Sequence, residues 1–452
     1  MEQLNYIIFF SVVYALIVIL CYTFVLCKPL PCELRYNKKL DFIAGPMLLG
    51  LLLLQFAVSG LAPGHVQDTG LFRAWTAFAE AHPVWEYYKT ELYVDYPPVY
   101  LYILYGLGKL LSLLHVDPAS GLYLACIRSI PIVFDGLSTL LIYKIACRRL
   151  GQKKALAAAL LCAINPARIV NSTIWGQVDS VTTFTTAVML LALYKKKYVA
   201  GFSLLSVLFL TKPQTIMFAP LLCFTLFFDF VKSWRQPAQR KQMLIQGGLS
   251  VLCAVAVLLL VPLPITGGDY GLLIEKYKAA LNLYPYATLN APNLYGAIGG
   301  NWAADSGRLL FLPYKIWGFV FIVLISLAVG FVSFTSRNRK HTFTLGIFTV
   351  LGIYMLGHGM HERYLAPALF LMLLAYAVNG DRRMLFFYAG FSLTTFIACA
   401  WVLTLNQTGA FIYGDNVWFR LLSWLNVVLF ILWMFVQRRD STSGAEKIRK
   451  RF

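Results

Sequence analysis

The chain has 452 residues, of which 59% are hydrophobic and only 13% are charged, and its formal net charge is +19. Soluble proteins carry about a quarter of their residues as charged side chains, so this composition excludes a soluble globular protein. The positive charge does not indicate a nucleic-acid partner, because the basic residues occupy short segments between apolar runs, where they set membrane topology.

Apolar runs that approach the roughly 20 residues needed to cross a bilayer recur along the whole chain. Helices satisfy their own backbone groups in lipid, and the sequence lacks the alternation of a membrane β-barrel. The sequence therefore predicts an all-α polytopic membrane protein. Its first run, Tyr6 to Leu26, has no basic n-region and no small-residue cleavage site, which favours an additional span over a removable signal.

Clusters of Lys and Arg separate many of the apolar runs and predict which loops are cytoplasmic. These clusters hold most of the basic residues and lie at 28–39, 148–154, 195–197, 232–241, 337–340, 382–383 and 438–451. Other segments hold most of the acidic residues and should lie on the opposite face. They are 62–121, 171–180, 211–214, 264–314, 357–364 and 405–416.

Two apolar runs, 97–114 and 122–146, break this alternation, because two crossings there would place the cluster at Arg148 on the outer face. The simplest solution is that 97–114 lies along the membrane surface, since it begins with two prolines and is rich in Tyr, which favours the interface. A short true span with one inverted loop is the alternative. The predicted count is about 13 spans, with the N-terminus outside and the C-terminus inside.

An acidic residue, Asp68, lies in the stretch Gln67-Asp68-Thr69-Gly70, directly after the apolar run Phe42–Leu61. It can be a solvated loop acid, a metal ligand or a general base, which must come within hydrogen-bond reach of the hydroxyl that it deprotonates. Asp95 and Asp179 lie on the same predicted face and are alternative bases.

Two cations on the predicted outer face suggest an anionic ligand. Lys212 stands alone between two apolar runs, on a face where basic residues are otherwise avoided. Arg363 has the guanidinium fork that suits phosphate, although an interfacial ion pair with Glu362 is the alternative. His358 and His361 have i, i+3 spacing without a well-placed third ligand, so no metal site is predicted.

The stretch Trp175-Gly176-Gln177-Val178-Asp179 combines an aromatic face with an amide and a carboxylate, residue types that hold sugars. Capping of the next helix by Asp179 is compatible with the same sequence. Arg128 and Asp135 share one helix face and are equally compatible with a structural pair, so we leave them outside the predicted site. Nine cysteines lie in or beside apolar runs without a CxxC spacing, which indicates neither a disulfide framework nor a zinc site.

Five motifs occur in one order: Asp68 in its loop, Asp95-Tyr96-Pro97-Pro98, Trp175 to Asp179, Lys212-Pro213-Gln214 and His361-Glu362-Arg363-Tyr364. In this order they resemble the GT-C glycosyltransferases over nearly the whole chain. The sequence is most similar to bacterial membrane proteins related to the second mannosyltransferase of GPI-anchor synthesis. It is more distantly similar to the dolichyl-phosphate-glucose-dependent glucosyltransferases of the endoplasmic reticulum.

The resemblance implies transfer of a hexose, mannose or glucose, from a polyprenyl-phosphate carrier such as undecaprenyl phosphate to an acceptor hydroxyl. Transfer would occur on the extracytoplasmic face with inversion, and Asp68 would be the catalytic base. We assign the donor phosphate to Lys212, Arg363 and His361. Sugar and acceptor binding are assigned to Trp175, Gln177, Asp179, Asp95, Tyr96 and Glu362. No cofactor beyond the donor is required; a divalent metal is compatible with the site but not indicated.

The predicted organisation is an extra N-terminal span and cytoplasmic loop (1–41), a GT-C catalytic module (42–263) and a variable C-terminal helical module (264–452) with a cytoplasmic tail at 437–452. We expect a multi-pass protein of the bacterial plasma membrane, with the endoplasmic reticulum membrane as the alternative. Its partners would be a lipid-linked sugar donor, membrane lipid and a glycolipid, polymer or protein acceptor.

The competing function is a transporter or flippase of a lipid-linked glycan, and a non-catalytic membrane scaffold is a third. A flippase needs charged groups along a path through the membrane, whereas the apolar runs contain few ionisable residues. They contain few beyond Arg128, Asp135, Lys144 and Asp229. This distribution favours the enzyme.

Overall fold

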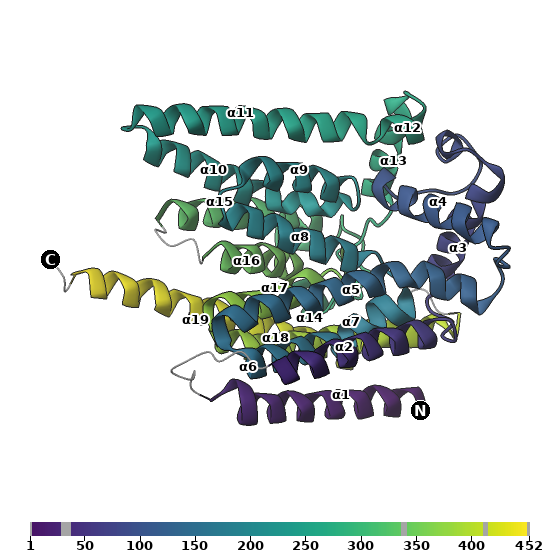
Figure 1. Ribbon diagram of the computed structural model, residues 1–452, viewed down its shortest axis with the longest axis horizontal. Coiled ribbons are helices and arrows are strands. Elements are labelled where there is room, and N and C mark those ends of the chain that lie inside the picture. Colours follow the sequence, from purple (N-terminus) through teal and green to yellow (C-terminus); the bar gives the residue numbers. More distant parts are fainter. Residues whose placement is uncertain (1, 29–37, 336–340, 410–414, 450–452) are drawn as a thin grey trace.

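The computed structural model describes residues 2–28, 38–335, 341–409 and 415–449. The described chain is predominantly helical, and its long helices lie side by side in one bundle (Figure 1). In chain order the first helices are α1 (Glu2–Cys21), η1 (Tyr22–Leu26), α2 (Lys38–Ser59), α3 (Val66–Ala81), η2 (Val84–Glu86), α4 (Pro98–Leu113), α5 (Gly121–Leu150), α6 (Gln152–Ala163), α7 (Pro166–Ile169), η3 (Val170–Trp175), α8 (Asp179–Tyr194) and α9 (Tyr198–Phe209).

The second half of the chain continues in the same way, with four two-residue strands in its loops. Its helices are η4 (Pro213–Phe218), α10 (Ala219–Ser233), α11 (Pro237–Leu260), α12 (Leu263–Thr266), α13 (Tyr270–Asn282), α14 (Leu294–Ala297), α15 (Tyr314–Thr335), α16 (His341–Leu356), α17 (Ala366–Asn379), α18 (Arg383–Asn406) and α19 (Val417–Arg449). The strands are β1 (Thr288–Leu289), β2 (Arg308–Leu309), β3 (Leu312–Pro313) and β4 (Met360–His361).

Eight helical segments of the described chain are long and apolar enough to cross a membrane, and a ninth is obtained if the bent pair of α6 with α7–η3 forms one span. The eight are Asn5–Leu26, Leu40–Ser59, Gly121–Leu150, Pro213–Ser233, Pro237–Thr266, Tyr314–Thr335, Arg383–Asn406 and Val417–Gln437. This architecture is that of a polytopic all-α membrane protein. The helices α8, α9, α16 and α17 are apolar but shorter, so the count of about 13 stays a prediction.

The short apolar helix α17 lies in the middle of the bundle. Every residue from Ala368 to Val378 is buried, and α17 packs against α5, α8, α16 and α18. A helix that is apolar on all sides needs such surroundings. It places the loop before it, which contains Arg363, at one end of the bundle core.

The two ends of the bundle carry different loops. At one end, the backbone oxygen of Lys28 accepts hydrogen bonds from Arg382 Nη2 at 3.1 Å and from Lys154 Nζ, so three of the predicted cytoplasmic segments meet there. The helix α19 ends at this end of the bundle, whereas α1 begins at the opposite end, with α3, α4, α12 and α13 (Figure 1). The basic residues Arg35, Arg337, Arg339, Lys340, Lys450 and Arg451 lie outside the described residues.

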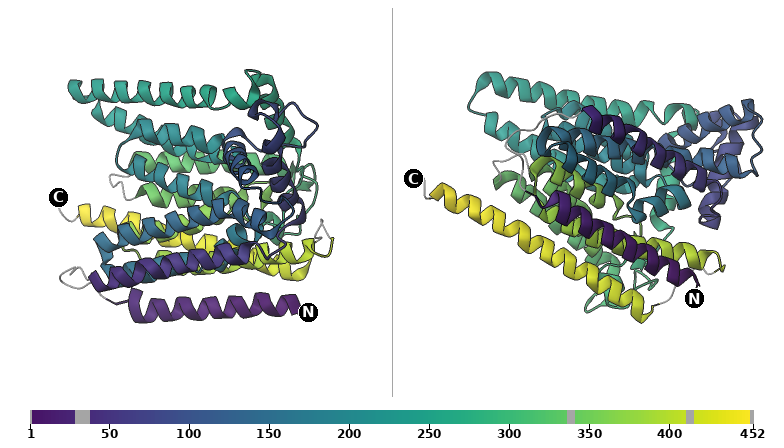
Figure 2. Two further views of the ribbon diagram at one scale, coloured as in Figure 1. Left: turned by 45° about the vertical axis from the view of Figure 1, so that its right-hand side comes forward. Right: turned by 60° about the horizontal axis from the view of Figure 1, so that its bottom comes forward.

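The helix α4 occupies most of the 97–114 run, which breaks the charge alternation. It begins with a proline in its first turn, a favoured position, and packs against α3. It is seen almost end-on in the left view of Figure 2, in which the long helices run across the page. The axis of α4 is thus inclined to the long helices, which agrees with the prediction that α4 does not cross the membrane with them. The depth of α4 in a bilayer stays a prediction.

The predicted orientation can be tested by labelling single cysteines in a cysteine-free background. Glu275→Cys, on α13, should react with a membrane-impermeant maleimide added to intact cells, because α13 lies at the end of the bundle with α3 and α4. Gln239→Cys, near the α10–α11 turn, should react only after the membrane is opened. Labelling with the opposite pattern would show that the orientation is reversed.

Candidate functional site

The carboxylate of Asp68 lies in the first turn of α3, where the helix dipole favours an anion. The residue before the helix, His65, caps it: its Nδ1 accepts from the backbone N–H of Asp68 at 3.5 Å. The first turn thereby fixes Asp68 relative to His65, whose Nδ1 lies 3.8 Å from Asp68 Oδ1.

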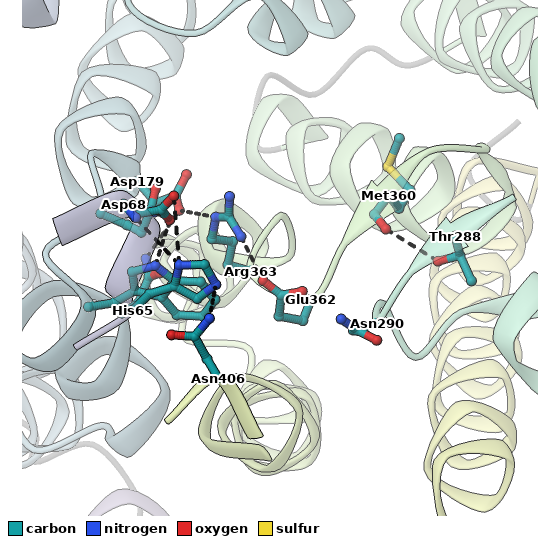
Figure 3. A network of polar contacts seen from close by, with 12 residues as sticks. His65, Asp68, Asp179, Thr288, Asn290, Met360, Glu362, Arg363 and Asn406 are labelled. Atoms are coloured by element: carbon teal, nitrogen blue, oxygen red, sulfur yellow. Dashed lines mark hydrogen bonds and ion pairs between the residues drawn. The ribbon is translucent and has the colours of Figure 1, made fainter. Parts of the chain in front are cut away.

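The end of α18 fixes the start of α3. Asn406 accepts a hydrogen bond from the backbone N–H of Val66 at 2.8 Å and donates to Gln67 Oε1 at 2.9 Å. Its Nδ2 also lies 3.2 Å from His65 Nε2 (Figure 3). Asn406 is thus a positioning residue for Asp68, and the predicted site did not include it.

Two side chains from one turn hold one oxygen of Asp68. Trp175 Nε1 donates to Asp68 Oδ2 at 2.7 Å, and Gln177 Nε2 donates to the same oxygen. The π-helix η3 ends at Trp175, and Gly176 follows in the left-handed region with φ of 84°, which turns Gln177 back toward α3. Because Oδ2 has two donors and Oδ1 lies beyond hydrogen-bond distance of His65, Oδ1 is the oxygen that can accept a proton from a ligand.

Arg128 supports this turn from the interior of the bundle. It is fully buried, and its Nη1 donates to the backbone oxygens of Ser59 and Ala62. Its side chain fills the space beside Gly64 and Gly176, where a Cβ would stand 2.0 Å from Nη2 and 2.9 Å from Cγ. Glycine is therefore required at both positions by close approach as well as by positive φ.

The other candidate of the same helix, Asp135, forms a pair that the sequence did not reveal. Arg168 donates to Asp135 Oδ1 through Nε at 3.1 Å and through Nη2 at 2.5 Å, and both side chains are almost fully buried. Arg128 and Asp135 are therefore not each other's partners.

A second cluster surrounds the carboxylate of Asp179, in the first turn of α8. Lys212 Nζ donates to Oδ1, Asn171 Nδ2 donates to Oδ2 at 3.3 Å, and Arg363 Nε lies 3.9 Å from Oδ2. Asp179 and Lys212 are 5% and 9% exposed. Lys212 is the single cation between two apolar runs of the sequence, and the fold supplies it with a buried carboxylate from another helix.

Arg363 connects the two carboxylate clusters. Its Nη1 donates to Glu362 Oε1 at 2.7 Å, and its guanidinium lies 4.9 Å from the centre of the Trp175 ring. Figure 3 shows the guanidinium between the carboxylates of Asp179 and Glu362. Its Nε is buried and makes no hydrogen bond. Such an unpaired buried donor requires an explanation, and a bound anion supplies one.

Pairing of β4 with β1 places the segment that contains Arg363. Met360 and His361 lie opposite Thr288 and Leu289 in a parallel register, and His361 also bridges to Asn290. The imidazole of His361 packs edge-on against the Tyr284 ring, with 4.8 Å between centres.

Asp95 and Tyr96 reach the same site from the segment before α4. The hydroxyl of Tyr96 donates to Gln177 Oε1 at 3.3 Å, so it orients the amide that holds Asp68. Asp95 Oδ1 is buried without a hydrogen-bond partner. Burial raises the pKa of Asp95, the charge of Asp68 raises it further, and Lys276 opposes both.

Burial changes the charges that the site can use. It lowers the pKa of His361 well below the usual range, and Arg363 and Lys212 lower it further, so His361 can donate a hydrogen bond at neutral pH but supplies no charge. Burial also lowers the pKa of Lys212, against the attraction of Asp179. For Arg363 burial opposes the charged form, yet Glu362, Asp68 and Asp179 hold its pKa well above its usual value.

The two histidines with i, i+3 spacing face different neighbours. His358 packs against Gly318 on α15, whereas His361 lies against Tyr284. In the described part of the chain, no three His, Cys, Asp or Glu side chains come close enough to hold a metal ion. The eight cysteines that the structure describes are all free.

The site thus brings together all ten residues that the sequence singled out, from five distant segments. Comparison with known families shows what part of this chain is similar to. Residues 95–260 match the family of dolichyl-phosphate-mannose-protein mannosyltransferases. This is a GT-C family.

The match to the mannosyltransferase family indicates a mannosyltransferase-like membrane glycosyltransferase with a lipid-linked sugar donor. It includes Asp95, Trp175, Asp179 and Lys212, and ends before Arg363. No curated protein matches the chain. The nearer resemblance to the second mannosyltransferase of GPI-anchor synthesis stays a prediction.

Lys212 should stabilise the fold through Asp179. Replacement by Met removes one partner of a buried ion pair, which costs roughly 3–5 kcal/mol when the remaining charge has no compensation. We expect a loss at the lower end of this range, because Arg363 stays near Asp179. The measurement is thermal and denaturant unfolding in detergent. Asp179→Asn added to Lys212→Met should recover part of the loss; a double variant that is less stable than either single one would contradict the pairing.

Buried histidines should make the protein less stable at acidic pH. The pKa of His361 is lowered in the folded chain and ordinary in the unfolded chain, so the unfolded chain binds more protons as the pH falls below its unfolded pKa, and the free energy of unfolding decreases. His361→Gln should reduce this decrease between neutral and mildly acidic pH. His115→Asn, at an exposed position, is the control. The same slope in wild type and His361→Gln would contradict the assignment.

Proposed function

We propose that this protein transfers a hexose from a polyprenyl-phosphate carrier to the hydroxyl of an acceptor, with Asp68 as the general base and with inversion at the anomeric carbon. The observation that carries the proposal is that one site contains a carboxylate oxygen without a hydrogen bond, Asp68 Oδ1, and a buried guanidinium N–H without a hydrogen bond, Arg363 Nε. Both groups contact Trp175, in a segment that matches a mannosyltransferase family.

The chemistry follows from these two groups. The acceptor hydroxyl loses its proton to Asp68 and attacks the anomeric carbon, and the bond from that carbon to the phosphate oxygen breaks. The products are the glycoside and a polyprenyl phosphate that carries one more negative charge. The proton then leaves Asp68 for water. Trp175 and Gln177 hold the carboxylate during the attack, so that its orientation does not have to be found in each turnover.

The leaving phosphate needs positive charge close to it, since electrostatic stabilisation is usually the largest catalytic contribution. Arg363 supplies it with the unpaired Nε donor, and Lys212 supplies a second charge from the other side of Asp179. His361 contributes a neutral N–H. Because the leaving group is a phosphate ester, no carboxylic acid is needed to protonate it, in contrast to glycosidases.

Two unpaired acceptors suit the sugar. Asp95 Oδ1 and Asn171 Oδ1 are both buried without a hydrogen-bond partner, and a hexose presents hydroxyl donors for such atoms. Asp179 is less suited to be the base than Asp68, because both its oxygens already have partners. We therefore assign Asp179 to the positioning of Lys212 and Arg363.

We propose mannose as the sugar because the matching family transfers mannose, with glucose as the alternative. Undecaprenyl phosphate is the carrier expected for a bacterial plasma membrane. The site is assigned to the extracytoplasmic face from the charge pattern. A flippase is less well supported. The charged pair in the bundle interior, Asp135 with Arg168, borders a cavity of only about 10 Å³, barely enough for one water.

Asp68→Asn should abolish transfer of mannose from synthetic polyprenyl-phosphate mannose, because the amide cannot accept the hydroxyl proton. Loss of general base catalysis reduces rates by about 10²–10⁴-fold. The variant should unfold at the same temperature and bind the donor as wild type does, since an amide can still accept from Trp175. Transfer is measured by the mass of the product in a reconstituted total lipid and polymer extract.

Asp95→Asn serves as the control for that experiment. It keeps the size of the other candidate acid and should lower the affinity for the donor sugar without abolishing turnover. Full activity of Asp68→Asn, together with an inactive Asp95→Asn, would move the role of base to Asp95.

A further inference from the structure

A cavity of about 670 Å³ lies between three membrane-spanning helices, α1, α18 and α19. Its walls are formed mainly by apolar side chains, for example Val12 from α1, Trp401 from α18 and Leu425 from α19. We call it the α1/α18/α19 groove. Its volume lies in the range of ligand pockets.

Three amides line the groove, one of them directly before the start of α19, and we call this part of the groove its mouth. Asn290, Asn301 and Asn416 line it, and none of its described lining residues is charged. Asn290 Oδ1 accepts from Trp302 Nε1 at 2.9 Å and from Asn301 Nδ2 at 3.2 Å. These two donors fix the amide of Asn290, so its Nδ2 is the end that can donate to a ligand.

The mouth of the groove is connected to the proposed catalytic site in two ways. Asn290 forms a β-bridge with His361, the residue before Glu362 and Arg363. On the other side, Trp401 of the groove wall and Asn406, which holds the first turn of α3, lie five residues apart on α18, a rise of about 7.5 Å. Figure 3 shows Asn290 and Asn406 on either side of the segment with Glu362 and Arg363.

We infer that the α1/α18/α19 groove binds the hydrocarbon chain of a lipid acceptor whose head is uncharged and hydroxylated, such as a neutral glycolipid. The inference rests on the proposed function and selects a lipid acceptor over a polymer or a protein. A hydrocarbon tail fits the walls, which belong to membrane-spanning helices. A hydroxylated head fits the amides at the mouth.

Charge distinguishes this ligand from the donor. The donor is an anion, and the buried cations of the site, Lys212 and Arg363, lie at Asp179 and not in the groove lining. Among the residues that line the groove, a phosphate would meet three amides and no cation, and the neighbouring Arg420 is already paired with Asp415. An uncharged head has no such requirement.

Moving a hydrocarbon tail from the bilayer into the groove changes the free energy little, because lipid is as apolar as the groove walls. The walls therefore orient the ligand, and the amides must select it. It follows that lipids with the same tails but an anionic head should compete poorly.

The test uses the full chain in nanodiscs of phosphatidylcholine, with a glucosyl-diacylglycerol that carries a photoactivatable diazirine in one acyl chain as probe. We expect the probe to label peptides of α1, α18 and α19, and unlabelled glucosyl-diacylglycerol to suppress labelling. Ser11→Trp fills the groove from α1, and overpacking of this kind should reduce labelling by about tenfold or more. Val12→Trp, at a lipid-exposed position of the same wall, is the second variant if Ser11→Trp does not fold.

Val13→Trp is the matched control, because Val13 neighbours both positions on α1 but does not line the groove. Its labelling should equal that of wild type. If added phosphatidylglycerol suppresses labelling as strongly as the glycolipid does, or if neither groove variant reduces it, the groove holds bulk lipid and the inference is overturned.

Donor binding and transfer are measured on the same samples, which separates the two proposals. If the groove variants lose the probe while Asp68→Asn still transfers sugar as wild type does, the proposed function fails and the groove stands as a lipid site. If Asp68 controls transfer and the groove variants label normally, the groove inference alone fails.

Discussion

One carboxylate oxygen joins the distant parts of this site. Asp68 Oδ2 accepts from both Trp175 and Gln177, which lie more than 100 residues away along the chain. Two charge-assisted bonds to one oxygen hold the carboxylate in place and leave the other oxygen free to react. Three neighbouring contacts stabilise this geometry. Gly176 turns Gln177 toward α3, and Arg128 fills the space beneath the turn. Asn406 holds the first turn of α3.

Buried charge determines what the rest of the site can bind. Removing Asp179, Lys212, Glu362 and Arg363 from water is costly, and each is compensated by an opposite charge. The compensation is incomplete at a few atoms, Arg363 Nε and the oxygens of Asp95 and Asn171. These atoms are held in place by the fold, so the phosphate and the sugar of the proposed donor would satisfy them without reorganisation of the protein.

The helix α18 connects this polar site with the membrane. Asn406 at its end contacts the first turn of α3, and Trp401 faces the apolar groove with α1 and α19. Under the proposed function, a polar reaction takes place at the surface of an apolar solvent. A helix that is polar at its end and apolar along its span provides both environments over a few residues. The first helix, α1, completes the groove.

The sequence alone determined the class of fold and which residues are candidates, because composition and the length of apolar runs record contact with lipid, and these are local properties. The charge pattern likewise assigned Asp68, Lys212 and Arg363 to one face. Only the tertiary structure decided the partners. Lys212 pairs with Asp179, Asp135 pairs with Arg168 and not with Arg128, and His65 and Asn406 join the site without a motif. A charge in a sequence shows that a partner is needed, but which partner it meets depends on how helices far apart in the chain pack together.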